Sequence, residues 1–167
     1  WHQLSSYDSE EFQAAFRNWL VQRYGFQNIG AMQHYFSSRN RILDAGCGSG
    51  FSSSLYLAKI DGVWFGADIS DAIDVAKDRI GAIPGTHFIQ ADMLDLPFLP
   101  CTFDTIFAEG VLHHTPSTEK ALKSLALLLK TKGEFLFYVY RQKAPVREFT
   151  DDYVRNSISP LDPAEAW

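Results

Sequence analysis

Residues 42–50 read ILDAGCGSG, a short apolar run followed by three glycines at alternate positions. Apolar residues such as Ile42 and Leu43 predict a buried strand, and glycines directly after a strand let the chain turn sharply into a following helix. They also let a ligand approach backbone N–H groups that a Cβ atom would shield. The stretch therefore predicts a strand, a tight turn and a helix, with a ligand close to the turn.

Strand and helix patterns alternate along the rest of the chain. Ser9 and Ser70 are expected to cap the helices that follow them. The expected strands are 41–45, 63–68, 86–92, 103–110 and 134–140, and the expected helices are 9–24, 29–36, 51–59, 71–82 and 118–129. Since parallel strands are joined by right-handed crossovers, this alternation predicts an α/β fold whose parallel sheet is covered by helices on both faces.

The composition suits one globular domain of 167 residues, with 46% apolar and 21% charged side chains. A net charge of −5 leaves no broad basic field for a phosphate backbone, so no nucleic-acid partner is expected. No apolar run approaches the roughly 20 residues of a membrane span, so no membrane partner is expected. Cys47 and Cys101 lack metal-ligand spacing, and we expect free thiols in a cytoplasmic protein.

The glycine spacing argues against two common nucleotide loops. The dinucleotide pattern G-x-G-x-x-G needs a third glycine where this chain has Phe51 or Ser53, which disfavours NAD and FAD. A triphosphate-binding loop needs Gly-Lys-Ser/Thr, but Gly50 is followed by Phe51 and Ser52, which disfavours ATP and GTP.

Acidic residues end the next two expected strands. Asp68 can accept hydrogen bonds from both hydroxyls of a ribose, although it could instead cap the following helix. Asp92 can accept from an exocyclic amine, and Met93 offers a polarizable surface for a purine ring. Turns are often acidic, and Asp95 is close by, so a purely local role for Asp92 stays open. Together these residues predict an adenosine site without a phosphate clamp.

Four segments in order carry a family resemblance: ILDAGCGSG, GADIS, IQADMLDLPF and FDTIFAEGVLHHTPS. They resemble the first four motifs of the class I S-adenosylmethionine-dependent methyltransferases of the small-molecule type, over residues 39–141. The resemblance implies S-adenosylmethionine as cofactor, bound by Asp44, Gly46, Cys47, Gly48, Gly50, Asp68, Ile69, Asp92, Met93 and Glu109.

The resemblance also implies a role for each of these residues. The three glycines would cradle the methionine end of the cofactor, with Asp44 bracing their loop and Cys47 a small residue beside it. Asp68 would hold the ribose, and Ile69 would pack on adenine. Asp92 and Met93 would recognise the adenine edge, and Glu109 would reach the amino-acid part.

Two neighbouring histidines, His113 and His114, follow the fourth expected strand. Adjacent residues point in different directions, so the pair makes a poor metal site, and no metal is expected. The resemblance puts them near the acceptor pocket, where one histidine could orient or deprotonate an acceptor. A structural hydrogen-bonding role is the alternative.

The acceptor is expected to be a small molecule or, less directly, a protein. Methyl transfer from a sulfonium is an in-line displacement that alignment and desolvation accelerate. Enzymes that methylate amino groups of nucleic acids carry Asn/Asp-Pro-Pro-Tyr after strand four, where residues 108–111 read AEGV. The other hypothesis is a non-catalytic protein that keeps the fold, and a nucleoside pocket, for sensing or assembly.

The expected architecture is a Rossmann-like, doubly wound sheet of order 3-2-1-4-5 without the family's strands six and seven. Residues 1–38 would form a helical lid, including Trp1, Tyr7, Trp19, Tyr24 and Tyr35, residues 39–141 the cofactor-binding core, and residues 142–167 a helical segment. The chain begins with Trp1 and ends with Trp167, which suggests a piece of a longer protein. An apolar fifth strand at the edge could pair two copies as a homodimer.

Overall fold

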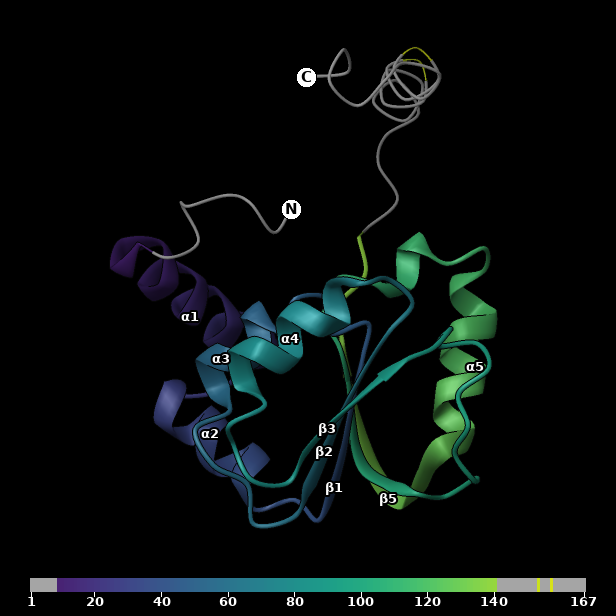
Figure 1. Cartoon of the computed structure of the whole chain (residues 1–167), viewed down its shortest axis with the longest axis horizontal. Coiled ribbons are helices and arrows are strands. Elements are labelled where there is room, and N and C mark those ends of the chain that lie inside the picture. The colour runs from purple at the N-terminus through teal and green to yellow at the C-terminus, as the bar shows by residue number, and fades with distance from the viewer. Residues whose placement is uncertain (1–8, 141–152, 154–156, 158–167) are drawn as a thin grey trace.

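Five parallel strands form one sheet in the computed structural model, which describes residues 9–140, 153 and 157 (Figure 1). The strands are β1 (Arg41–Ala45), β2 (Val63–Asp68), β3 (Thr86–Gln90), β4 (Phe103–Ala108) and β5 (Leu129–Phe137). Their order is β3-β2-β1-β4-β5, and every neighbouring pair is parallel. The predicted α/β class, strand order and Rossmann-like arrangement are confirmed.

Helices cover both faces of this sheet, as predicted. The described helices are α1 (Glu10–Tyr24), α2 (Ile29–Ser37), α3 (Phe51–Tyr56), α4 (Ala72–Ile80) and α5 (Thr118–Leu128), with a short 3-10 helix η2 (Leu112–His114). In Figure 1, α1 to α4 lie on one side of the sheet and α5 lies on the other. Because successive residues of a strand point to opposite faces, Ile42 packs with the first group and Leu43 packs with α5.

Each face has its own buried core. Trp64 and Phe107 lie in the core under α1 to α3, and Ile106 lies in the core under α5. All three side chains have 0% exposure. Burying one large apolar side chain contributes about 1.5–3 kcal/mol, so these two layers fix the strand ends in space. The carboxyl ends of β1, β2 and β4 therefore form a rigid edge.

Several element boundaries differ from the sequence expectation. Helix α3 ends at Tyr56 because Leu57, 2% exposed, leaves the helix and enters the core. Asp71, not Ser70, occupies the N-cap position of α4, although the Ser70 hydroxyl still accepts from Ala72 N at 3.4 Å. Strand β5 starts before Gly133, with an irregular pairing to β4 where Lys132 has a φ of 67°.

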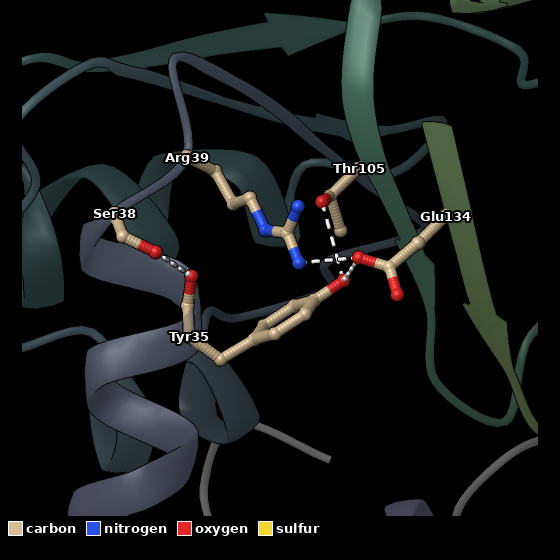
Figure 2. A network of polar contacts seen from close by, with 5 residues as sticks. All are labelled: Tyr35, Ser38, Arg39, Thr105 and Glu134. Carbon is tan, nitrogen blue, oxygen red and sulfur yellow. Dashed lines mark hydrogen bonds and ion pairs between the residues drawn. The ribbon is translucent and has the colours of Figure 1, made fainter. Parts of the chain in front are cut away.

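A polar cluster joins α2 to the far strands (Figure 2). We call Tyr35, Arg39, Thr105 and Glu134 the Tyr35 clamp. The Tyr35 hydroxyl donates to Glu134 Oε2 at 3.1 Å and lies 3.3 Å from Thr105 Oγ1. Arg39 forms an ion pair with Glu134 and stacks on Tyr35, 4.1 Å from the ring centroid.

The Tyr35 clamp lies away from the carboxyl edge of the sheet, since Arg39 lies two residues before Arg41, the first residue of β1. Tyr35 is therefore wrongly placed for a lid over that edge. Trp1 and Tyr7 lie outside the described residues, as does nearly all of the predicted C-terminal helical segment.

Candidate functional site

The glycine loop, residues 46–50, connects β1 to α3. Its three glycines have φ angles of 77°, 52° and 68°, a region that side chains with a Cβ rarely adopt. A Cβ on Gly46 would lie 2.4 Å from Val111 Cγ2, whereas a Cβ on Gly48 would meet nothing within 4 Å. The loop is thus packed against the segment after β4 at Gly46 and open at Gly48, where a ligand has room.

The amides of this loop are already used by the protein. The amides of Gly46 and Cys47 donate to the Ala67 carbonyl at 2.7 and 3.1 Å. Gly48 N donates to Asp68 Oδ2 at 2.8 Å, and Gly50 N donates to the Cys47 carbonyl at 2.9 Å. A phosphate-binding loop presents its amides to the anion. The expectation that a ligand reaches free N–H groups therefore fails at these four positions, and a phosphate has little to bind there.

Asp44 lies at 2% exposure beneath the loop. Its Oδ2 accepts from the Ser53 hydroxyl and, at 3.1 Å, from the Tyr56 hydroxyl. Burial raises the pKa of this carboxyl to about 7, and the charges of Glu109 and Asp68 act in the same direction. Asp44 thus ties β1 to α3, and it supports the loop through that helix.

Asp68 connects the end of β2 to the glycine loop. Besides the bond from Gly48, its Oδ1 accepts from Ser70 N at 2.9 Å and from the Ser70 hydroxyl at 2.6 Å. Each carboxylate oxygen has two lone pairs, so Oδ2 keeps capacity for one further donor. Asp68 therefore shapes the turn before α4 and also presents an acceptor beside the loop.

The residues expected to surround adenine lie beside Asp68 and after β3. Ile69 is 68% exposed, which is unusual for a large apolar side chain next to a rigid edge. Asp92 Oδ1 accepts from Leu94 N at 2.9 Å, which makes it part of a local turn. Met93 packs partly buried against the α5-side core. Apolar surface and an acidic group therefore occur together here.

Cys47 contacts the inner side of the loop. A Cβ on Gly66 would lie 2.9 Å from its sulfur, so the thiol fills the space over β2. Burial, followed by the charges of Asp44 and Asp68, raises the pKa of this thiol. A protonated thiol is a poor nucleophile, so Cys47 acts as a small packing residue.

Glu109, directly after β4, is bound by the N-terminal helix. The Tyr24 hydroxyl donates to Glu109 Oε2, and the Tyr24 ring packs on Phe107 with centroids 5.0 Å apart. Burial raises the pKa of Glu109, although the bond from Tyr24 and the charge of Arg23 oppose the rise. Helix α1 is therefore fastened to the tip of β4.

His113 and His114 form η2 with Leu112, close to Val111 and the glycine loop. The His113 ring packs against the tilted rings of His114 and Tyr140, with centroid distances of 4.1 and 3.9 Å. Both His113 ring nitrogens are buried and have no hydrogen-bond partner among the residues that the structure describes. Burial, followed by His114, lowers the pKa of His113, so this ring is neutral at neutral pH.

The charge around the loop is negative on several sides. Asp44, Asp68 and Glu109 come from three different strands, and their charges act on one another across the loop. The basic group that touches the loop is Arg79, which donates to the Ser49 carbonyl at 3.2 Å. A cluster of acids around occupied amides favours a cationic ligand over a phosphate.

The sequence profile of the methyltransferase-domain family matches residues 43–137. This chain belongs to that family. The predicted resemblance to class I S-adenosylmethionine-dependent methyltransferases is confirmed, and the profile spans the glycine loop, both acidic strand ends and η2.

Individual relatives of this methyltransferase domain agree. A protein of Encephalitozoon cuniculi provisionally named a methyltransferase is 31% identical over 86% of this chain and 63% of its own length. The solved structure of YcgJ from Bacillus subtilis is 26% identical over 78% of this chain and 57% of that chain, with a TM-score of 0.64. The solved methyltransferase CalH, in complex with S-adenosylhomocysteine, is 25% identical over 70% of this chain and 36% of that chain, with a TM-score of 0.55. This chain therefore spans between 36% and 63% of the length of these relatives.

Sequence reasoning missed Arg23, and it placed Tyr24 in the N-terminal lid without predicting its bond to Glu109. Both lie at the end of α1, and the Tyr24–Glu109 bond joins residues 85 positions apart. An aromatic residue and a cation at the end of a helix carry no local signal of such a contact.

Two negative findings concern the described part of the chain alone. No group of three or more His, Cys, Asp or Glu side chains in it could hold a metal ion. None of its helices combines the length and the apolar character that crossing a membrane requires.

Proposed function

We propose that this chain is the cofactor-binding part of an enzyme that transfers a methyl group from S-adenosylmethionine to a small-molecule acceptor. The observation that carries the proposal is the glycine loop, whose amides at Gly46, Cys47, Gly48 and Gly50 are occupied and whose neighbours are acidic. S-adenosylmethionine has no phosphate and carries a positive sulfonium and a positive ammonium group. The loop suits this charge pattern and suits dinucleotides and triphosphates poorly.

Each cofactor-contacting residue has a role consistent with its contacts. The open space at Gly48 admits the methionine end, and Gly46 and Gly50 let the loop pack tightly on either side. The Asp68 carboxylate accepts from a ribose hydroxyl. Ile69 and Met93 provide apolar surface for adenine, and Asp92 accepts from its exocyclic amine.

The acidic residues also bear on the chemistry. When bound, S-adenosylmethionine supplies a methyl group from its sulfonium, and the rest of the cofactor is the leaving group, a neutral thioether. Asp44 and Glu109 would orient the ammonium end through charge, Asp44 from beneath the loop and Glu109 from the tip of β4. Cys47 keeps water from the loop's inner side, because its thiol is protonated and fills the space over β2.

His113 is the better candidate for a proton acceptor of the two histidines. Its neutral ring has two nitrogens without partners, while His114 is more exposed. A ring in that state can accept a proton from an acceptor hydroxyl or amine, or donate a hydrogen bond that orients it. His114 lowers the proton affinity of His113, which favours the neutral ring but does not make it a stronger base.

The remaining expectations belong to the same proposal. Net charge of −5 supports a small-molecule acceptor over nucleic acid, and free Cys47 and Cys101 support a cytoplasmic location. The contact of Tyr24 with Glu109 supports a lid role for the N-terminal segment. Phe137, 42% exposed at the end of β5, supports pairing of two copies along that edge.

Calorimetric titration tests the cofactor directly. S-adenosylmethionine and S-adenosylhomocysteine are expected to bind with micromolar Kd, and ATP and NAD are expected not to bind. A folded sample that binds ATP or NAD but neither S-adenosyl compound would contradict the proposal. Transfer of a labelled methyl group to a panel of small acceptors then separates an enzyme from a non-catalytic binding protein.

A further inference from the structure

Arg23 lies against two aromatic rings at the carboxyl edge of the sheet. Its guanidinium carbon is 4.9 Å from the centroid of Trp19 and 3.9 Å from that of Tyr138. The two rings meet edge to face, with centroids 5.7 Å apart. We call Trp19, Arg23 and Tyr138 the arginine cradle. Stacking on flat rings holds a guanidinium in one plane and leaves its edge available.

The guanidinium has no acceptor in the described part of the chain. The charge of Arg23 opposes the burial-driven rise in the pKa of Glu109, but Glu109 takes its hydrogen bond from Tyr24. Arginine has five N–H donors in a fork that matches a carboxylate with two parallel bonds. A cavity of about 270 Å³ adjoins these donors and is lined by Trp19, Gln22 and Arg23. The cradle thus combines a fixed cation, free donors and room for a ligand.

The position of the cradle links it to the candidate site. Tyr138 N donates to the Ala108 carbonyl at 3.2 Å, so the cradle lies at the ends of β4 and β5, beside Glu109. The Tyr138 ring contacts Tyr140, which stacks on His113, with centroid distances of 5.6 and 3.9 Å. A ligand in the cradle would therefore extend toward the histidine with unpaired nitrogens.

We propose that the arginine cradle binds a carboxylate group of a ligand of this site. The inference rests on the proposed function for the place of the reaction. Arg23 would form two hydrogen bonds to the carboxylate, and Trp19 and Tyr138 would contact the apolar or planar part next to it. The carboxylate has two sources, the methyl acceptor or the amino-acid end of the cofactor.

Two binding experiments on the chain distinguish these sources. The first titrates benzoate and its uncharged analogue benzamide in the presence of saturating S-adenosylhomocysteine, followed by tryptophan fluorescence and calorimetry. The second compares S-adenosylhomocysteine with 5′-methylthioadenosine, which lacks the amino acid and its carboxylate. Both use Arg23→Gln, with Arg17→Gln on the same helix as the matched control.

If the acceptor supplies the carboxylate, benzoate binds, benzamide does not, and Arg23→Gln weakens benzoate at least about tenfold, the scale of a lost charged hydrogen-bond pair. If the cofactor supplies it, Arg23→Gln weakens S-adenosylhomocysteine by a similar factor and leaves 5′-methylthioadenosine unchanged. Arg17→Gln changes neither. The proposal is overturned if Arg23→Gln leaves the affinity for benzoate unchanged and also leaves unchanged the ratio of the affinities for S-adenosylhomocysteine and 5′-methylthioadenosine.

A second variant guards against a folding defect. Arg23→Lys keeps the positive charge beside the rings but loses the two-pronged geometry. We therefore expect about a threefold loss of affinity for whichever ligand Arg23→Gln weakens. Wild-type protein that fails to bind S-adenosylhomocysteine would contradict the proposed function, and the benzoate arm would still report on the cradle.

Discussion

The two halves of the carboxyl edge differ in how their polar groups are satisfied. At β1 and β2, the loop amides and the carboxylates of Asp44 and Asp68 bond to the chain itself. At β4 and β5, the His113 nitrogens and the Arg23 guanidinium find no acceptor or donor in the described residues. The first half is held in place by the chain itself, and the second presents polar groups that a ligand would satisfy.

The largest effect expected from this difference is on the pH dependence of stability. Asp44 has a pKa of about 7 in the folded protein and an ordinary value of 3.8 in the unfolded chain. Between these values the folded state holds a proton that the unfolded chain has released. The free energy of unfolding should therefore fall as pH rises from about 4 to 7, by about 4 kcal/mol at roughly 1.4 kcal/mol per pKa unit.

Urea unfolding of Asp44→Asn across this pH range measures the effect. The amide keeps acceptors for Ser53 and Tyr56, so the variant should lose the slope and stay folded. Asp104 is the control of opposite sign. Burial tends to raise its pKa, but the bond from Lys130 outweighs burial and lowers it, so Asp104 stabilises at neutral pH and loses that effect in acid. An unchanged slope in Asp44→Asn would show that another group titrates.

The next effect concerns cofactor affinity. Asp68→Ala removes the anchor of Gly48 and an acceptor for ribose, and we expect S-adenosylhomocysteine to bind about a hundredfold more weakly. Calorimetry measures the change. Asp61→Ala is the matched control, because Asp61 is exposed and its carboxylate meets only Lys59, at 3.9 Å. Equal affinities of the two variants for S-adenosylhomocysteine would show that Asp68 does not take part in cofactor binding.

Substitution of Gly46 tests how tightly the glycine loop packs, with Gly25 at the end of α1 as the control. Gly46→Ala combines a φ of 77° with a Cβ 2.4 Å from Val111, while Gly25→Ala has a φ of 72° and open space. Gly25→Ala should cost about 1–2 kcal/mol from backbone strain alone. Gly46→Ala should cost about 2 kcal/mol more from overpacking. Chemical denaturation measures the free energy of unfolding of both variants. Equal losses would mean that Val111 moves aside without an energetic cost.

The smallest effect concerns the link between the halves. Tyr24→Phe keeps the ring on Phe107 and loses the bond to Glu109, so the free energy of unfolding should fall by about 1 kcal/mol. Tyr140→Phe, an exposed tyrosine without a hydrogen bond in the described structure, should change it little. A stability loss that is the same in both would contradict a specific role for the Tyr24 hydroxyl.

The sequence predicted the β1 and β2 half well because its signals are local. The strands 41–45 and 63–68 are apolar runs bounded by glycine or by acids, and both have the expected ends. The glycine spacing disfavoured phosphate-binding loops, and the structure gives a physical reason, because the loop amides already donate to acceptors in the chain. The spacing could not show that the amides are occupied, since their acceptors, such as Ala67 and Asp68, lie on the neighbouring strand.

The β4 and β5 half was predicted less well because it depends on distant contacts. The start of β5 was missed because Lys132 adopts a positive φ, and nothing in the sequence indicates such a backbone angle at a residue other than glycine. The arginine cradle joins residues 19–23 to Tyr138, and no periodicity within either segment connects them.

The Tyr35 clamp has a consequence for synthesis of the chain. Its Arg39–Glu134 pair joins residues 95 positions apart, so α2 leaves the ribosome long before its partner on β5 exists. At 5–20 residues per second, the delay is about 5–20 s. During that interval Tyr35 and Arg39 have no Glu134 to meet, and the N-terminal helices wait for the fifth strand. A nascent chain released before residue 134 would therefore be a substrate for chaperones, even though its glycine loop is already complete.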